Sequence, residues 1–242
     1  MGTLVAGAPA LRIGTAVSLP LDLVSVLSLL YRAVPGSGLD PWLVATRKAL
    51  PAALRADLDL LHGFSGRLLY YPEEPVMRFA PLSPARRDAT FDDLHAFLER
   101  TPPAEYLAMA AHALRRVHAD LDLPFVDPVG GDDAAWRRAL APCLTTADPD
   151  EALALLRTPA ELKRRTVDLF RRLWEPVYRD EYRRRLPALT EAARLGRPLA
   201  RGELSAAFCQ LTDKRLPLEL AEAAPSLQSA TFCPSAHLGD LA

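Results

Sequence analysis

The sequence has few cysteines, no large net charge and no long apolar run. Its three cysteines, Cys143, Cys209 and Cys233, are odd in number and far apart, which argues against a secreted disulfide framework and favours a reducing compartment. The most apolar stretch, residues 23–31, is too short to cross a bilayer. The N-terminus also lacks the basic and apolar pattern of a secretion signal. We therefore expect a cytoplasmic protein that is not inserted in a membrane.

Motifs that carry chemistry are also scarce. The five histidines, at positions 62, 95, 112, 118 and 237, include no pair four residues apart and no cysteine at metal-ligand spacing, so we expect no metal site. No P-loop, glycine fingerprint, G-x-S-x-G motif or acid-base carboxylate pair is present. Because no residue can be assigned a catalytic role and no cofactor motif is found, we do not expect an enzyme.

Opposite charges almost cancel, since 29 basic and 30 acidic residues give a formal net charge of −1. This balance argues against a chain that coats nucleic acid through its overall charge. Hydrophobic residues make up 50% of the sequence, which is typical of a chain that folds around a core. We expect one helical domain over residues 1–242, in which the proline-rich segment 62–88 is a candidate for an internal boundary.

Many of the 22 prolines stand where helices are expected to begin, near capping residues such as Asp40 and Thr90. Together with apolar residues at steps of three and four, they predict a mainly α fold of several helices with a few short strands. Helices are predicted at residues 20–34, 41–50, 51–61, 91–100, 102–121, 133–144, 148–157, 158–186, 203–211 and 217–223. A loop over 62–88, an extended piece at 67–71 and a strand at 228–233 are also predicted.

The longest predicted helix, residues 158–186, begins with Thr158 as its cap and Pro159 at its first position. We expect a kink near Pro176, because a proline inside a helix removes a backbone donor and crowds the preceding turn. Residues 158–201 hold twelve Lys and Arg against six Asp and Glu. Because five of these acids have a base four residues later, we favour a self-paired, solvated face over a DNA-reading surface.

Four aromatic residues of this helix, Phe170, Trp174, Tyr178 and Tyr182, follow one another at steps of four and so share one face. Such a stripe is most simply part of the core, because aromatic rings dominate packing. The alternative is a pocket wall for an apolar ligand, in which buried tyrosine hydroxyls would need partners and would add specificity.

Four segments, taken in order along the chain, resemble the N-terminal region of a group of bacterial ArsR-type winged-helix transcriptional regulators. The segments are residues 17–30, 41–58, 173–181 and 232–239. In that group a long helical domain of unassigned function precedes the DNA-binding part. The last segment, which includes Pro234 and His237, is followed there by more sheet and a winged helix, whereas this sequence stops at Ala242. The resemblance thus implies an effector-sensing or dimerisation portion that lacks its C-terminal winged helix.

The resemblance implies a homodimer whose helices respond to an apolar small molecule, and DNA contact only through the winged helix that this chain does not include. The mechanism would be conformational, since a ligand has to bind two helix arrangements with different affinity to have a regulatory effect. Metal sensing is not implied, because the ligands that some relatives use have no counterpart here. The predicted ligand-binding residues are Trp42, Phe170, Trp174, Tyr178 and Tyr182, chosen for their aromatic character.

Two other hypotheses remain open. A small-molecule enzyme would need a site that is assembled only in three dimensions, for which Tyr106, His112, Glu175 and Tyr182 are the nominated residues. A purely structural interaction domain would instead have an exposed apolar patch and no enclosed pocket.

Overall fold

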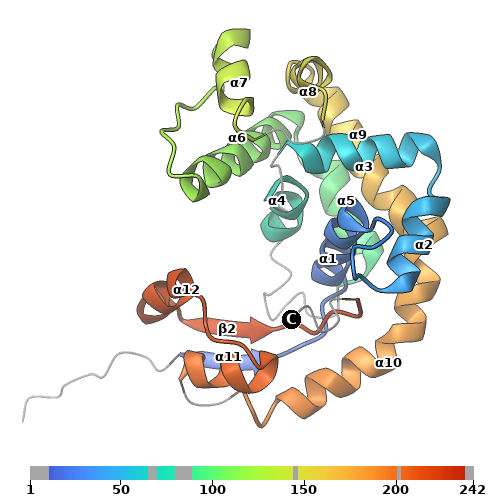
Figure 1. Ribbon diagram of the computed structural model, residues 1–242, viewed down its shortest axis with the longest axis vertical. Coiled ribbons are helices and arrows are strands. Elements are labelled where there is room, and N and C mark those ends of the chain that lie inside the picture. The colour runs from blue at the N-terminus through green and yellow to red at the C-terminus, as the bar shows by residue number, and fades with distance from the viewer. Residues whose placement is uncertain (1–10, 65–69, 80–88, 144–146, 201–202, 238–242) are drawn as a thin grey trace, which may run out of the picture.

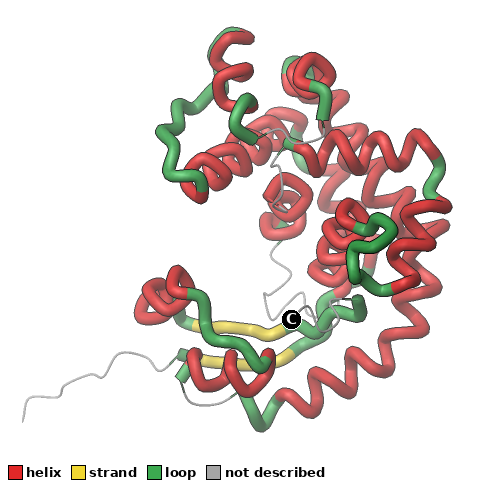
Figure 2. Tube along the Cα trace, viewed as in Figure 1, coloured by secondary structure: helices red, strands yellow, loops and turns green. Residues whose placement is uncertain are grey.

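The computed structural model describes residues 11–64, 70–79, 89–143, 147–200 and 203–237. The chain is mainly α-helical, as predicted, and the described residues contain one two-stranded sheet (Figures 1 and 2). In chain order the elements are β1 (Arg12–Thr15), α1 (Leu19–Arg32), α2 (Pro41–Ala49), α3 (Ala52–Gly63), α4 (Tyr70–Arg78), α5 (Phe91–Arg100), α6 (Pro103–Asp120), α7 (Asp133–Leu140), α8 (Pro149–Leu156), α9 (Pro159–Leu173), the π-helical turn η2 (Trp174–Tyr178), α10 (Arg179–Gly196), α11 (Leu204–Thr212), α12 (Leu218–Ala223), the short 3₁₀ turn η3 (Ala224–Ser226) and β2 (Ser229–Phe232). None of the described helices is both long and apolar enough to span a membrane.

Capping side chains fix most of the helix starts that the sequence predicts. Asp40 accepts a hydrogen bond from the Trp42 backbone N–H at 2.8 Å and starts α2, and Thr90 forms a reciprocal capping box with Asp93 at the start of α5. Such side chains satisfy backbone N–H groups that have no partner within the helix. Thr158 stands at the N-cap position of α9 as predicted, but it makes no capping hydrogen bond, because its hydroxyl donates to the Ala154 carbonyl of the preceding helix.

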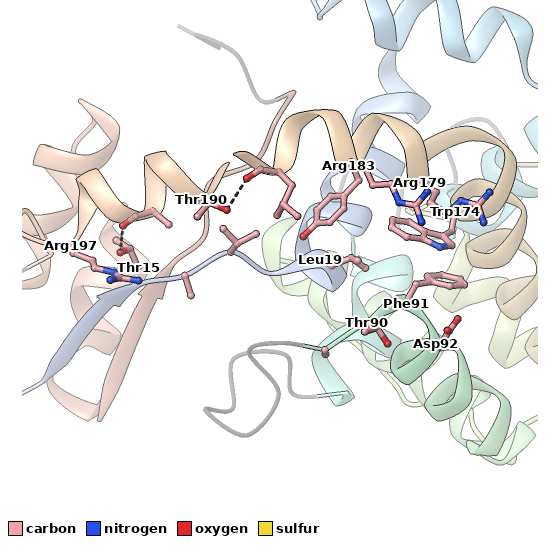
Figure 3. Close-up of a pocket in the computed structure, with 16 residues that line it drawn as sticks. Thr15, Leu19, Thr90, Phe91, Asp92, Trp174, Arg179, Arg183, Thr190 and Arg197 are labelled. Atoms are coloured by element: carbon pink, nitrogen blue, oxygen red, sulfur yellow. Dashed lines mark hydrogen bonds between the residues drawn. The ribbon is translucent and has the colours of Figure 1, made fainter. Parts of the chain in front are cut away.

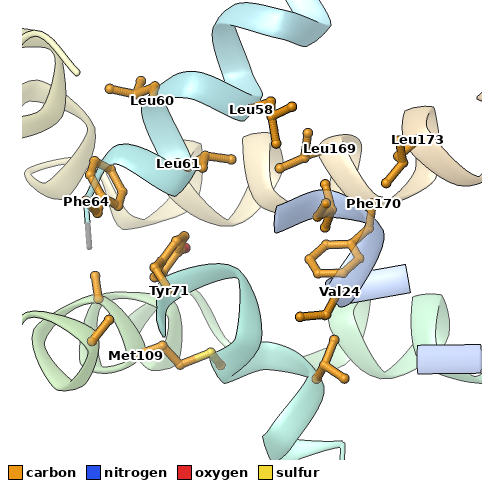
Figure 4. Close-up of a cluster of buried hydrophobic side chains, with 14 of the residues drawn as sticks. Val24, Leu58, Leu60, Leu61, Phe64, Tyr71, Met109, Leu169, Phe170 and Leu173 are labelled. Atoms are coloured by element: carbon orange, nitrogen blue, oxygen red, sulfur yellow. The ribbon is translucent and has the colours of Figure 1, made fainter. Parts of the chain in front are cut away.

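The core lies where α1, α3, α4, α6 and α9 meet, and Figure 4 shows their apolar side chains converging. Helix α1 is buried on most of its surface, and Leu23, Val26, Leu27 and Leu30 are fully inaccessible to solvent. Phe170 of α9 is also fully buried and packs in the same cluster. A helix that is apolar nearly all round belongs in the interior, which is why the short apolar stretch of the sequence lies here.

The predicted loop over residues 62–88 contains a helix, α4, so that prediction is wrong over Tyr70–Arg78. The expected extended piece at 67–71 is wrong at its last two residues, which are helical, while 65–69 lie outside the described residues. Pro72 stands in the first turn, where a helix has no use for the backbone N–H, and the helix tolerates Pro75 in its interior. Burial of Tyr71, Val76 and Phe79 against α1, α3 and α6 outweighs the missing hydrogen bond. The described part of 62–88 thus packs into the helical body, and the domain division stays a prediction.

The long helix continues well past its predicted end at Leu186, because α9, η2 and α10 follow one another without a break from Pro159 to Gly196, and Figure 1 shows that the helix is curved. The distortion expected near Pro176 is confirmed as a π-helical turn, in which the Arg179 N–H donates to the Trp174 carbonyl five residues earlier. In a regular helix, a stripe at steps of four drifts by about 40° per step. The wider turn takes up part of that drift and keeps the aromatic rings of the stripe together.

The predicted strand near the C-terminus is confirmed as β2, and its partner β1 was not predicted. The two strands are parallel, with Arg12 opposite Ser229 and Thr15 opposite Phe232. Figure 1 shows this sheet with α11 and α12 at the far end of α10, away from α6–α8. The segments that begin and end the described chain therefore lie side by side, although the whole helical body separates them in sequence.

The self-paired charges predicted for residues 158–201 are present, but most pairs differ from those expected. Glu181 and Arg185 form an i, i+4 pair as predicted, whereas Arg164 bridges Glu161 and Asp168. Arg165 and Arg172 instead both reach Asp57 of α3. Part of the basic character of this helix is therefore used in tertiary packing.

Replacement of Phe170 by alanine is expected to lower the free energy of unfolding by about 3–5 kcal/mol, because it removes a ring from the centre of the core. Urea denaturation measures this change. The same replacement at Phe208, which is only half-buried beside β2, is the matched control and should cost much less. Equal costs at the two positions would contradict the placement of the core.

Candidate functional site

A pocket of about 760 Å³ lies between α10, the segment that joins β1 to α1, and the start of α5 (Figure 3). Along α10 the lining residues recur at steps of three and four, so they occupy one face of the helix. The lining residues are Thr15, Ala16, Val17, Leu19, Ala89, Thr90, Phe91, Asp92, Trp174, Arg179, Tyr182, Arg183, Leu186, Thr190, Ala193 and Arg197. The pocket therefore follows the length of a single helix face rather than closing around a point.

One end of the pocket is aromatic. Phe91 of α5 stacks on Trp174, with ring centroids 5.2 Å apart, and Tyr182 lies 5.8 Å from Trp174. Burial, with a smaller contribution from the charge of Asp22, raises the pKa of Tyr182 to about 12. The Tyr182 phenol therefore stays neutral at physiological pH, and the three rings give this end of the pocket an aromatic surface.

At the other end of the pocket, the sheet is fastened to α10. The Thr15 hydroxyl donates to the Ala193 carbonyl at 2.6 Å, and the side chain of Thr15 packs against Gly196, where an added Cβ would come within 3.0 Å of it. Thr190 donates to the Leu186 carbonyl at 2.8 Å. Figure 3 shows Thr15 and Arg197 together at this end, opposite the corner formed by Trp174 and Phe91.

Behind the aromatic end lies a second feature, the His237 cluster, which we define as Asp22, Asp40, Tyr178, Glu181 and His237. The His237 side chain is fully buried, with Nδ1 3.1 Å from Asp40 and Nε2 3.5 Å from Glu181. Glu181 is also buried and is paired with Arg184 and Arg185. Buried charges persist only when they are paired in this way.

Within the same cluster, Asp22 near the start of α1 is hydrogen-bonded to two other parts of the chain. Its carboxylate accepts hydrogen bonds from the Tyr178 hydroxyl and from the backbone N–H of Ala236. Burial and the neighbouring Asp22 charge raise the pKa of Tyr178 well above its ordinary value, so this phenol acts as a donor. The residues 235–237 are thereby fixed against α1, α2 and α10.

The five predicted ligand-binding residues lie close together but not on one surface. Trp174 and Tyr182 line the pocket, whereas Phe170 is enclosed in the core. Trp42 stacks on His237 with ring centroids 4.6 Å apart, and Tyr178 lies 6.0 Å from Trp42. Ligand binding by these residues stays a prediction, and their placement splits the stripe between core, cluster and pocket.

The residues nominated for an enzyme are spread over the fold. The Tyr106 hydroxyl donates to the Leu98 carbonyl in the interior, and His112, a half-exposed residue of α6, pairs with the buried Glu74 of α4. Glu175 forms a long ion pair with Arg171, and only Tyr182 lines the pocket. Within the described ranges, no group of three or more His, Cys, Asp or Glu side chains is arranged to hold a metal ion.

The fold and the pocket define a mainly helical protein with an elongated site along one long helix. Comparison with models of known protein families, with curated proteins and with solved structures gives no match. The site is therefore interpreted from its own geometry.

Sequence reasoning missed the partners of His237 and most of the pocket lining. Asp40 and His237 are 197 positions apart, and no local pattern connects them. Asp22 did carry a signal, because it is a charged residue within an apolar helix, and buried aspartates are almost always paired. Nothing in the sequence indicates that segment 15–19 would face α10.

Asp40 provides a test of the cluster, because it both caps α2 and pairs with His237. Burial tends to raise its pKa, but the Trp42 N–H, His237 and Arg185 outweigh this and hold the pKa of the carboxyl below its ordinary value. Asp40 thus stabilises the fold above the ordinary aspartate pKa of about 3.9, and this contribution is lost as pH falls through the lower folded value. Asp40→Asn, which keeps a capping side chain, should cost about 1 kcal/mol at about pH 5 and less at about pH 3 in urea denaturation.

Asp40→Ala is the companion variant, since it removes the cap as well as the charge. It should cost about 1 kcal/mol more than Asp40→Asn at both pH values. A cost of Asp40→Asn that does not change with pH would contradict the charged pairing.

Proposed function

We propose that this chain is the effector-sensing portion of an ArsR-like transcriptional regulator, in which a small apolar molecule in the α10 pocket alters how the C-terminal segment is held. The observation that carries the proposal is that the pocket and the His237 cluster share one helix. Tyr182 lines the pocket, and Glu181, the preceding residue, pairs with His237. A ligand that moves Tyr182 therefore acts directly beside Glu181, the residue that holds the C-terminal segment through His237.

The aromatic contacts provide a second connection between the two features. Tyr182 and Trp174 both contact Tyr178, at ring-centroid distances of 6.1 and 6.4 Å. Tyr178 in turn lies 6.3 Å from the His237 ring and donates to Asp22. Because packed rings and buried hydrogen bonds hold discrete arrangements, a change at the pocket wall can alter the stability of the cluster.

The place of His237 in the chain gives the connection its regulatory meaning. His237 lies in the segment that resembles the stretch before the sheet and winged helix of ArsR-type regulators. In this proposal, DNA contact is made by such a module, and the ligand shifts a population of helix arrangements without chemistry on the ligand. A homodimer is part of the proposal, since helix-turn-helix regulators commonly bind paired half-sites.

The experiment is hydrogen–deuterium exchange of the full chain with and without N-phenyl-1-naphthylamine, a neutral apolar fluorescent probe. The probe is expected to bind with a rise in its fluorescence and to change the exchange of amides in segment 229–237. That segment lies outside the pocket, so a change there reports on the coupling between the two features.

A matched pair of variants separates pocket binding from adsorption to the surface. Leu186→Asp places a charge in the pocket wall and should abolish both the fluorescence and the exchange response, whereas Leu195→Asp, on an exposed part of α10 outside the lining, should preserve both. Probe binding that leaves segment 229–237 unchanged, or equal responses in the two variants, would overturn the proposal.

A further inference from the structure

The shape of the pocket restricts its ligand. Arg179, the first residue of α10, and Arg197, the residue directly after it, both line the pocket and are eighteen positions apart, which corresponds to about 27 Å at 1.5 Å per residue. Between them the lining follows one helix face, opposite the extended segment 15–19. A compact ring would occupy only part of such a pocket, whereas a long, narrow molecule can contact its whole length.

The middle of the pocket is apolar. Between the two ends, Val17, Leu19 at the start of α1 and Leu186 of α10 line the pocket. Leu186 is 37% exposed, although leucine is usually buried, so the pocket presents aliphatic surface to solvent. An alkyl chain would cover this surface, and each methylene group buried contributes about 0.8 kcal/mol.

Charge at the pocket edge is one-sided. Three arginines line the pocket, Arg179, Arg183 and Arg197, against a single acid, Asp92. Arg179 and Arg183 share one partner outside the lining, Asp180, at 3.9 and 3.5 Å. These pairs are long and exposed, so they compete weakly with a ligand.

Arg197, the residue directly after α10, differs from Arg194 in the last turn of that helix. Arg194 holds both carboxylate oxygens of Glu191, at 2.7 and 2.6 Å, and does not line the pocket. Arg197 lines the pocket, and within the described residues its guanidinium has no ion-pair partner. A guanidinium in this position can bind a carboxylate through two parallel hydrogen bonds.

From this combination of a long pocket with an apolar middle and unbalanced arginines we infer that the pocket binds a long-chain fatty acid, with the alkyl chain along α10 and the carboxylate on an arginine at the edge. The inference rests on the proposed function, because it names the chemical class of the effector. The ligand has to be the free acid. An ester or an alcohol of the same length lacks the negative charge that the arginines recognise.

The test is equilibrium dialysis of the full chain against radiolabelled palmitic acid, hexadecanol and butyric acid, each below its aggregation concentration. Palmitic acid is expected to bind at least about tenfold more tightly than hexadecanol, because it adds a charge-assisted hydrogen bond, and butyric acid should show no binding. Equal affinity for palmitic acid and hexadecanol would overturn the inference.

Variants then locate the carboxylate. Arg179→Gln, Arg183→Gln and Arg197→Gln are compared with Arg194→Gln, the matched control on the same helix. At least one of the first three should lose about tenfold or more in palmitic acid affinity with hexadecanol affinity unchanged, and the control should lose nothing. If none of the three reduces the affinity for the acid, the inference is wrong.

The outcomes also separate this inference from the proposed function. If the neutral probe changes exchange in segment 229–237 while palmitic acid and hexadecanol bind equally, the sensing proposal stands and the fatty-acid class fails. If palmitic acid binds with the expected charge dependence but leaves that segment unchanged, the ligand class stands and the sensing proposal fails.

Discussion

The buried imidazole of His237, held between the carboxylates of Asp40 and Glu181, is the contact on which the arrangement of the C-terminal segment depends. Taking these groups out of water is costly, and the cost is met only when each has a partner. Arg185 supports the same carboxylates, and Asp22 fixes the neighbouring backbone through Ala236. The segment is thereby held by α1, α2 and α10. Strand β2, which precedes it, pairs with β1.

The long helix connects this anchor to the pocket. Pro176 lacks a backbone N–H, and the helix forms a π-helical turn at this point. In this turn, successive aromatic residues of the stripe project in nearly the same direction. Of these, Trp174 and Tyr182 line the pocket and Tyr178 enters the His237 cluster. Because η2 and α10 form one continuous helix, a ligand that lies along α10 contacts the same helix that holds the C-terminal segment through Glu181. The coupling that we propose needs no other moving part.

Local features of the fold were predictable, and long-range ones were not. Helix starts such as the one at Asp40 depend on residues a few positions apart, so the sequence displays them. Helix α4 was missed because Pro72 and Pro75 argue locally against a helix, whereas burial of Tyr71 and Val76 in the core decides the outcome. Strand β1 was missed because a four-residue strand depends on a partner at the other end of the chain. The aromatic stripe was identified correctly, yet its division among core, cluster and pocket depends on packing that no spacing encodes.

A double-mutant cycle between Glu181→Gln and His237→Asn tests the central contact most directly. Both replacements keep approximate size and remove one side of the pair, and urea denaturation gives the free energy of unfolding for the two single variants and the double variant. Our account predicts a coupling energy of about 1–3 kcal/mol, since the two side chains contact each other in the interior. Additive costs, within about 0.5 kcal/mol, would contradict the anchoring of the C-terminal segment on α10 through this pair.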